Sequence, residues 1–217
     1  MIGILGGTFN PIHHGHLRLA EELADALDLE AVRIIPASIP PHREAPRVST
    51  EHRLQMARLA CAANSRLLVD ERECRRRGPS YTVDTLHELR RELGASTLLS
   101  LLMGVDAFNA LTTWSRWEEL FQLAHIVIAQ RPGFRFEGES LPAALARQAE
   151  TRSAQSLSDL HMHPAGLIAF CTITALDISG TAIRSSIAQG RSARYLLPDA
   201  VLDYIREHQL YKDLDAR

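Results

Sequence analysis

The stretch from Gly6 to His16, GGTFNPIHHGH, concentrates residues that can bind phosphate. Two adjacent glycines lack Cβ atoms, so a phosphate or a ribose can approach the backbone closely. His13 and His16 lie three residues apart, and in a first helical turn they share one face. Imidazole N–H groups donate hydrogen bonds to phosphoryl oxygens, most strongly when protonated. Gly15 leaves room between the two rings. The pattern predicts a phosphate-binding site.

Other chemistry is compatible with these histidines. The stretch contains neither the GxGxxG fingerprint of dinucleotide-binding folds nor the Gly-Lys-Ser/Thr of a P-loop. His13 and His16 could ligate zinc, but no HExxH glutamate or cysteine pair accompanies them. The three cysteines, Cys61, Cys74 and Cys171, are odd in number and widely spaced, which excludes a cysteine-rich zinc site and a disulfide framework. A two-histidine zinc site stays open as an alternative.

Two later segments place phosphate-binding groups in loops. Residues 177–184, DISGTAIR, include hydroxyl residues that can cap a helix, and Arg184 one turn into it can reach a phosphate at the helix N-terminus. Residues 40–43, PPHR, follow a strand, and the two prolines can hold His42 and Arg43 in position. Read alone, residues 177–184 are best interpreted as a capped helix with a surface arginine, and residues 40–43 could be a solvated loop.

Three more segments carry groups suited to the rest of a nucleotide. Residues 78–86, GPSYTVDTL, form a turn that leads into a helix, whose free N–H groups can bind a carboxylate. Asp106 ends a strongly apolar stretch, and a carboxylate at a strand end is better explained by ligand binding than by core packing. Arg131 follows a further strand. Trp117 is expected to pack within a helix, and the basic run 75–77 to be solvated.

Strands and helices alternate along the chain and must position these residues. Apolar runs predict strands, helical spacing with caps predicts helices, and Ser115 to Glu118 has the pattern of a capping box. This alternation predicts an α/β fold, a Rossmann-like, doubly wound and mostly parallel sheet with helices on both faces, as one domain over residues 1–217. Residues 131–164 are expected to form a surface excursion. The expected strands are 2–5, 32–35, 67–69, 98–103, 126–129 and 167–170, and the helices 17–27, 50–63, 82–93, 115–123, 181–189 and 198–208.

Composition narrows the class of protein. The 217 residues include 24 Lys and Arg against 26 Asp and Glu, giving a net charge of −2. That balance argues against a nucleic-acid binder or a membrane-surface protein, which usually shows a basic excess. No apolar stretch approaches the roughly 20 residues of a membrane span, and the N-terminus has no charged region of a signal peptide. We therefore expect a cytoplasmic protein.

The motifs together resemble a known family. His13-His14-Gly15-His16 resembles the HxGH motif of the HIGH-type nucleotidyltransferase superfamily, and the longer GGTFNPIHHGH with ISGTAIR (178–184) resembles the bacterial nicotinate-nucleotide adenylyltransferases. Similarity of the shorter motifs extends it from residue 3 to about residue 211. The resemblance implies transfer of AMP from ATP to nicotinate mononucleotide, with nicotinate adenine dinucleotide and pyrophosphate as products. Asn10 departs from the family's usual aspartate, and Asn keeps the acceptor and turn preference without the charge.

The same resemblance implies a role for each matching residue. It makes His13, His16 and Arg184 catalytic and implies Mg²⁺ arriving with ATP, no further metal site, and ATP and nicotinate mononucleotide as partners. It leaves a homo-oligomer open. The implied ATP-binding residues are Gly6, Gly7, Thr8, Phe9, His13, His16, Gly104, Asp106, Ile178, Ser179, Thr181 and Arg184. The implied residues binding nicotinate mononucleotide are His42, Arg43, Ser80, Tyr81, Thr82, Asp106, Trp114 and Arg131.

Three other functions remain as alternatives. A sister adenylyltransferase or cytidylyltransferase on the same scaffold could act on nicotinamide mononucleotide or phosphopantetheine. A non-catalytic nucleotide sensor could use the same pocket, although the presence of His13, His16 and Arg184 argues against it. A zinc hydrolase would contain stoichiometric zinc.

Overall fold

The computed structural model describes residues 1–39, 46–132, 141–174 and 176–212, and contains one six-stranded sheet in which every strand pair is parallel. The strand order is β3-β2-β1-β4-β5-β6. The chain adds β2 and β3 on one side of β1 and then β4, β5 and β6 on its other side, which is the arrangement of a doubly wound fold. The predicted fold class is therefore confirmed. The strands are β1 (Ile2–Gly7), β2 (Ala31–Pro36), β3 (Leu67–Val69), β4 (Leu99–Gly104), β5 (His125–Gln130) and β6 (Ile168–Thr172).

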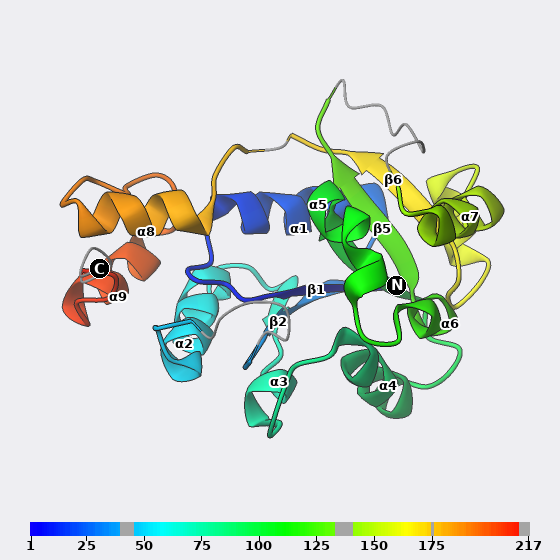
Figure 1. Ribbon diagram of the computed structural model, residues 1–217, viewed down its shortest axis with the longest axis horizontal. Coiled ribbons are helices and arrows are strands. Elements are labelled where there is room, and N and C mark those ends of the chain that lie inside the picture. Colours follow the sequence, from blue (N-terminus) through cyan, green and yellow to red (C-terminus); the bar gives the residue numbers. More distant parts are fainter. Residues whose placement is uncertain (40–45, 133–140, 175, 213–217) are drawn as a thin grey trace.

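Helices connect the strands and cover the sheet (Figure 1). The final pair, α8 and α9, lies at one end of the molecule, and α6 and α7 lie at the other. The α-helices are α1 (His14–Ala26), α2 (Thr50–Cys61), α3 (Arg72–Arg75), α4 (Thr82–Leu93), α5 (Val105–Asn109), α6 (Leu120–Leu123), α7 (Ala143–Arg152), α8 (Gly180–Ala188) and α9 (Asp199–Glu207). The 3₁₀ helices are η1 (Leu111–Thr113), η2 (Trp117–Glu119) and η4 (Leu157–His161).

The strands are buried on both faces because their side chains alternate between two apolar cores. In β5, Val127 belongs to the core shared with α1, α2, α8 and α9, while the adjacent Ile126 and Ile128 belong to the core shared with α4, α6 and α7. All three side chains are fully buried. Burial of one such side chain contributes about 1.5–3 kcal/mol, so both cores anchor the central strands.

Local signals explain several helix ends. Ser49 caps α2, since its hydroxyl accepts a hydrogen bond from the His52 N–H at 3.4 Å. Helix α4 spans the predicted residues 82–93, and Gly94 ends it at a φ of +94°, a backbone conformation that glycine adopts without strain.

Two local predictions were wrong, and a third holds only in part. Residues 131–164 are more than a surface excursion, because Leu145 of α7 and Leu160 of η4 are fully buried in the cores. The capping box at 115–118 is absent, since Arg116, with a φ of +50°, precedes η2 and makes no side-chain cap. The prediction of a solvated basic run holds for the exposed Arg75 and Arg77, but Arg76 is largely buried and pairs with Glu88 at 2.8 Å. Trp117 packs as predicted, edge-on against Phe121.

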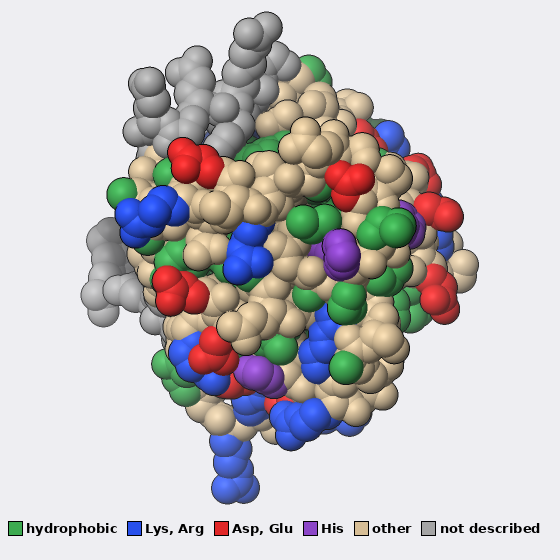
Figure 2. Space-filling model, turned by 90° about the vertical axis from the view of Figure 1, so that its right-hand side faces the viewer, with side chains coloured by type: hydrophobic (Ala, Val, Ile, Leu, Met, Phe, Trp, Pro, Cys, Tyr) green, Lys and Arg blue, Asp and Glu red, His purple; other side chains and the backbone are tan. Residues whose placement is uncertain are grey.

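The outer surface mixes charges. On the face shown in Figure 2, acidic and basic side chains are interspersed instead of gathering by sign. Among the described residues, no helix is long and apolar enough to cross a membrane.

Candidate nucleotide-binding site

The carboxyl ends of the parallel strands share one sheet edge, and the histidine motif lies where β1 ends there. His13 caps α1 in an extended conformation, and its backbone N–H donates a hydrogen bond to Nδ1 of His16 at 3.3 Å. The two imidazole rings stack with centroids 3.7 Å apart, and Phe9 meets the His16 ring edge-on at 5.0 Å. The predicted sharing of one face is confirmed. Because Nδ1 of a neutral His16 accepts, Nε2 carries its proton and is the available donor.

Both rings are neutral at physiological pH in the free protein. Burial, with the neighbouring His14, lowers the pKa of His13 to about 4. Burial, with the neighbouring His13, lowers the pKa of His16 to about 3. The Nδ1 atom of His13 is buried and has no hydrogen-bond partner among the described residues. An unpaired buried polar atom carries a free-energy cost, which a ligand that supplies a partner removes.

Hydrogen bonds to its carbonyl oxygens hold the loop that follows β1 in place. Ala37 N–H donates to the Gly7 carbonyl at 2.9 Å, and Arg184 Nη1 donates to the Asn10 carbonyl at 2.8 Å. The Asn10 side chain accepts a hydrogen bond from the Tyr211 hydroxyl at 2.7 Å. The backbone N–H of Thr8 donates no hydrogen bond to a backbone carbonyl of the described residues. This arrangement leaves an N–H donor for an anion at the end of β1.

Helix α8 begins beside the same loop. Ser179 caps it by accepting from the Ala182 N–H at 3.2 Å, and Arg184 Nη2 donates to Thr181 Oγ1 at 3.2 Å. A Cβ atom on Gly180 would lie 3.0 Å from the Asn10 carbonyl oxygen, so the helix start packs closely on the loop. A Cβ on Gly15 would lie 3.5 Å from the Ile178 carbonyl oxygen. The two motifs, about 170 residues apart in the sequence, therefore lie against each other in the fold.

The three glycines of the motif have different surroundings, and each suits glycine for a different reason. A Cβ on Gly6 meets nothing within 4 Å, so this residue leaves open space at the strand end. A Cβ on Gly7 would lie 2.9 Å from the Phe9 ring, and one on Gly15 would lie 3.1 Å from the His13 ring. Gly7 and Gly15 thus allow the aromatic and imidazole rings to pack where they do.

The turn before α4 is braced by Ser80. Its hydroxyl accepts from the Ser38 N–H at 3.0 Å, and its own N–H donates to the Ile39 carbonyl at 3.0 Å. Ser80 is buried, and its hydrogen bonds to Ser38 and Ile39 position the turn. The next two residues, Tyr81 and Thr82, are partly exposed at the N-terminus of α4. Free N–H groups at a helix N-terminus can bind an anion, so this turn is a candidate site for a carboxylate.

The remaining predicted residues follow β4 and β5 at the same edge. Gly104 ends β4, Asp106 is exposed in the first turn of α5, and Trp114 is partly exposed just after η1. Arg131 follows β5 and pairs with the exposed Asp177 at 3.1 Å. Topology brings these residues to the edge that holds the histidines. His42 and Arg43 lie outside the described residues.

Two contributors to the site escaped the sequence reasoning. Tyr211 holds Asn10 from the far end of the chain, and nothing in the local sequence signals that contact. Arg53 donates to the Thr8 carbonyl at 2.8 Å from inside α2. A signal for Arg53 existed, because it lies three and four residues before Met56 and Ala57, on the buried stripe of the helix.

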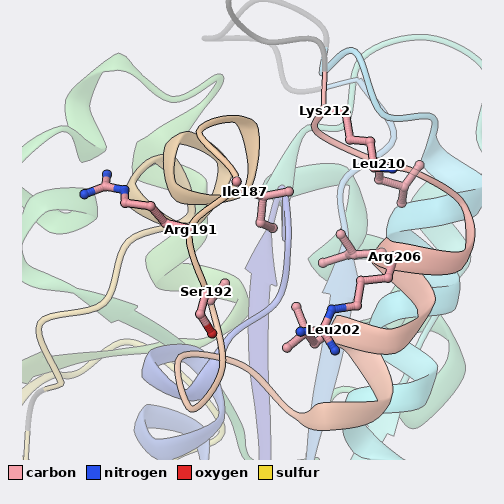
Figure 3. A pocket seen from close by; sticks show the side chains of 10 residues that line it. Ile187, Arg191, Ser192, Leu202, Arg206, Leu210 and Lys212 are labelled. Atoms are coloured by element: carbon pink, nitrogen blue, oxygen red, sulfur yellow. The ribbon is translucent and has the colours of Figure 1, made fainter.

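A separate cavity lies between α8 and α9 (Figure 3). It has a volume of about 330 Å³ and an apolar lining that includes Ile187, Leu202 and Leu210. Arg191 also borders it, but its side chain points away from Leu202 and Arg206. None of the described site residues lines this cavity, which is distinct from the edge that holds the histidines.

Comparisons with known proteins show which family the chain belongs to. The family described as "Cytidylyltransferase-like" matches residues 4–186, and the chain belongs to that family of nucleotidyltransferases. It is 53% identical to a Halorhodospira halophila protein over 97% of this chain and 94% of that one. It is 51% identical to a Dechloromonas aromatica protein over 98% of both chains. Both relatives are named "Probable nicotinate-nucleotide adenylyltransferase". Within the wider family, the chain belongs to the nicotinate-nucleotide adenylyltransferases, and it is an enzyme of that kind.

A solved structure shows the same fold. The Plasmodium falciparum nicotinic acid mononucleotide adenylyltransferase complexed with NaAD aligns with a TM-score of 0.71 and 16% identity. The match covers 97% of this chain and 96% of that chain. A second structure of that enzyme, complexed with APC, aligns with a TM-score of 0.68.

Proposed function

We propose that this protein transfers AMP from ATP to nicotinate mononucleotide, forming nicotinate adenine dinucleotide and pyrophosphate. The observation that carries the proposal is the convergence of the His13–His16 pair, the loop at Thr8 to Asn10, and Arg184 at one sheet edge. The relatives' names and the enzyme complexed with NaAD support the choice of substrates.

The reaction requires alignment and charge stabilisation. A phosphate oxygen of nicotinate mononucleotide attacks the α-phosphorus of ATP, and the bond from that phosphorus to the oxygen bridging to the β-phosphorus breaks. The attacking oxygen is already anionic, so the protein needs no general base. In-line alignment and donors aimed at the developing charge then account for catalysis.

The donors divide between the two parts of the triphosphate. His16 Nε2 and His13 donate to oxygens at the α-phosphorus, where charge builds during the transfer. Arg184 uses one N–H on Asn10 and one on Thr181, and the other three of its five N–H groups remain for the leaving pyrophosphate. Ser179 and Thr181, at the start of α8, add hydroxyl and helix N-terminal groups beside it.

The nicotinate nucleotide occupies the neighbouring part of the edge. Tyr81 and Thr82 present the start of α4 to the nicotinate carboxylate, and Trp114 stacks on the pyridine ring. Asp106 accepts hydrogen bonds from ribose hydroxyls, and Arg131 binds the nucleotide phosphate. Ser80 contributes by holding the turn. His42 and Arg43 are assigned to the phosphates in the same proposal.

Mg²⁺ enters as part of the ATP complex. Among the described residues, no three His, Cys, Asp or Glu side chains gather at a position that could hold a metal ion. In the proposal Mg²⁺ would come with the triphosphate and keep several waters, and when bound it would supply positive charge for the leaving pyrophosphate. The cytoplasmic location stays a prediction from the sequence, and the oligomeric state stays open.

The test is incubation of the purified protein with ATP, Mg²⁺ and nicotinate mononucleotide, followed by identification of the products. We expect nicotinate adenine dinucleotide and pyrophosphate in equal amounts. A parallel reaction with nicotinamide mononucleotide should be slower, because the start of α4 favours a carboxylate over an amide. Faster turnover of the amide, or no pyrophosphate with either nucleotide, would contradict the proposal.

A further inference from the structure

Arg53 of α2 is a buried cation held by neutral oxygens. Its side chain is only 1% exposed. Nη1 donates to the carbonyls of Thr8 at 2.8 Å and Ala37 at 2.6 Å, and Nη2 donates to the Ser38 carbonyl at 2.8 Å and to Thr50 Oγ1 at 3.0 Å. No carboxylate in the described part of the chain lies within ion-pair distance of it. Burying a charge without a counter-ion is costly, so the position calls for an explanation.

The contacts of Arg53 join the two halves of the proposed site. Thr8 belongs to the loop assigned to ATP. Ser38, on the loop after β2, donates its N–H to Ser80 at 3.0 Å, and Ser80 braces the turn assigned to nicotinate. One guanidinium therefore fixes the ATP loop directly and the nicotinate turn through a single intervening residue.

The shape of the guanidinium matters for this link. Its planar fork reaches the carbonyls of Thr8 and Ser38 from two different nitrogens at the same time. An ammonium has a single nitrogen and could not occupy both positions. The two loops are otherwise connected at this edge by the hydrogen bond from Ala37 N–H to the Gly7 carbonyl.

We propose that Arg53 is a positioning residue that sets the distance between bound ATP and bound nicotinate mononucleotide by clamping the loops after β1 and β2. The inference rests on the proposed adenylyl transfer. Misplacement of reacting groups by about 1 Å can cost on the order of 100-fold in rate, so loosening this clamp lowers kcat more than it weakens the binding of either substrate.

The chain offers a matched control in Arg90 of α4. Arg90 also donates to carbonyls, those of Leu123 at 2.8 Å, Thr97 at 2.6 Å and Pro164 at 2.7 Å. These residues precede β5, β4 and β6, so this second arginine clamps loops at the amino edge of the sheet, opposite the site. Loss of Arg90 therefore reports the purely structural cost of removing a carbonyl clamp.

The experiment compares Arg53→Met, Arg53→Lys and Arg90→Met by thermal denaturation and by kcat and KM for both substrates, per folded enzyme. We expect both methionine variants to be destabilised. Arg53→Met should lose about 30-fold in kcat with each KM changed by less than about three-fold, and Arg90→Met should keep kcat within about two-fold. Arg53→Lys should regain stability but not kcat, because the ammonium lacks the fork.

A kcat for Arg53→Met similar to that of Arg90→Met would overturn the inference, as would full recovery of kcat in Arg53→Lys. If Arg53→Met does not fold, Thr50→Val removes only one acceptor of the fork. It should destabilise the protein less than Arg53→Met does and lower kcat about three-fold or more per folded enzyme. An unchanged kcat in Thr50→Val would then reject the clamp. Absence of product from the wild-type enzyme would instead reject the proposed function.

Discussion

The lowered pKa of His16 allows one substitution to be judged by two independent measurements. His16→Ala removes the Nε2 donor, and by analogy with the loss of one oxyanion-hole donor it should cost about 3 kcal/mol of barrier, or on the order of 100-fold in kcat. His16→Gln restores an amide N–H near the position of Nε2, so it should retain about ten-fold more activity than the alanine variant. Pyrophosphate release at saturating substrates measures both.

The same substitution changes acid stability in a defined direction. Folded His16 stays neutral down to a pKa of about 3, while the unfolded chain takes up a proton below its usual pKa of 6.5. The unfolded state therefore binds more protons below pH 6.5, and the free energy of unfolding falls as the pH decreases through that window. For one such imidazole the loss reaches about 2 kcal/mol near pH 5 and vanishes above about pH 7.

Urea denaturation of wild type and His16→Ala at about pH 7.5 and about pH 5 tests this reasoning. We compare the free energy of unfolding of the variant with that of wild type at each pH. The difference, variant minus wild type, should be about 2 kcal/mol more favourable to the variant at about pH 5 than at about pH 7.5, because only wild type loses stability through His16. A difference between the two proteins that is the same at both pH values would refute the assignment of a neutral buried ring. A kcat within about three-fold of wild type would refute the donor role.

Three further outcomes follow from single contacts. Gly15→Ala places a Cβ 3.1 Å from the His13 ring, so kcat should fall at least ten-fold, by the order of magnitude of an alignment effect, while thermal denaturation shows a change within about 1 kcal/mol. Tyr211→Phe removes the 2.7 Å hydrogen bond to Asn10 and should cost about 1–2 kcal/mol in urea denaturation and raise the KM for ATP. ATP binding should take up protons near pH 5, because phosphate charge raises the pKa of His13 and His16 from about 4 and about 3, and calorimetry in buffers of different ionisation enthalpy measures that uptake.

The order of strands and helices could be predicted because its signals are local. Helix α4 was predicted to the residue, since Gly94 ends it in a conformation that suits glycine. Helix α7 was missed because glycine and proline surround it, although Leu145 and Ala149 lie four residues apart on its buried face. In that segment the tertiary core, rather than a strong local pattern, decides the structure.

The contacts that assemble the site are long-range, and this limits what a single sequence predicts. The motifs at His13 and Arg184 were each visible, but the hydrogen bond from Arg184 to the Asn10 carbonyl joins residues 174 positions apart. Arg53 was missed for another reason. Charged side chains are mostly exposed, so a charged residue within the apolar stripe of a helix is ordinarily expected to reach the surface. Only the three-dimensional position of the carbonyls of Thr8 and Ser38 explains why Arg53 is buried.

The charges of the site are divided between permanent and conditional donors. Burial is the main reason that the two imidazoles, with centroids 3.7 Å apart, are neutral in the free protein, and the charges of neighbouring histidines add to it. Arg53 and Arg184 instead provide permanent positive charge at the loop on which ATP is proposed to bind. Protonation of an imidazole becomes favourable only when phosphate charge lies beside it, and that charge increases at the α-phosphorus during transfer. The histidines can therefore stabilise the transition state more than the bound ground state, which is the condition for an interaction to raise kcat.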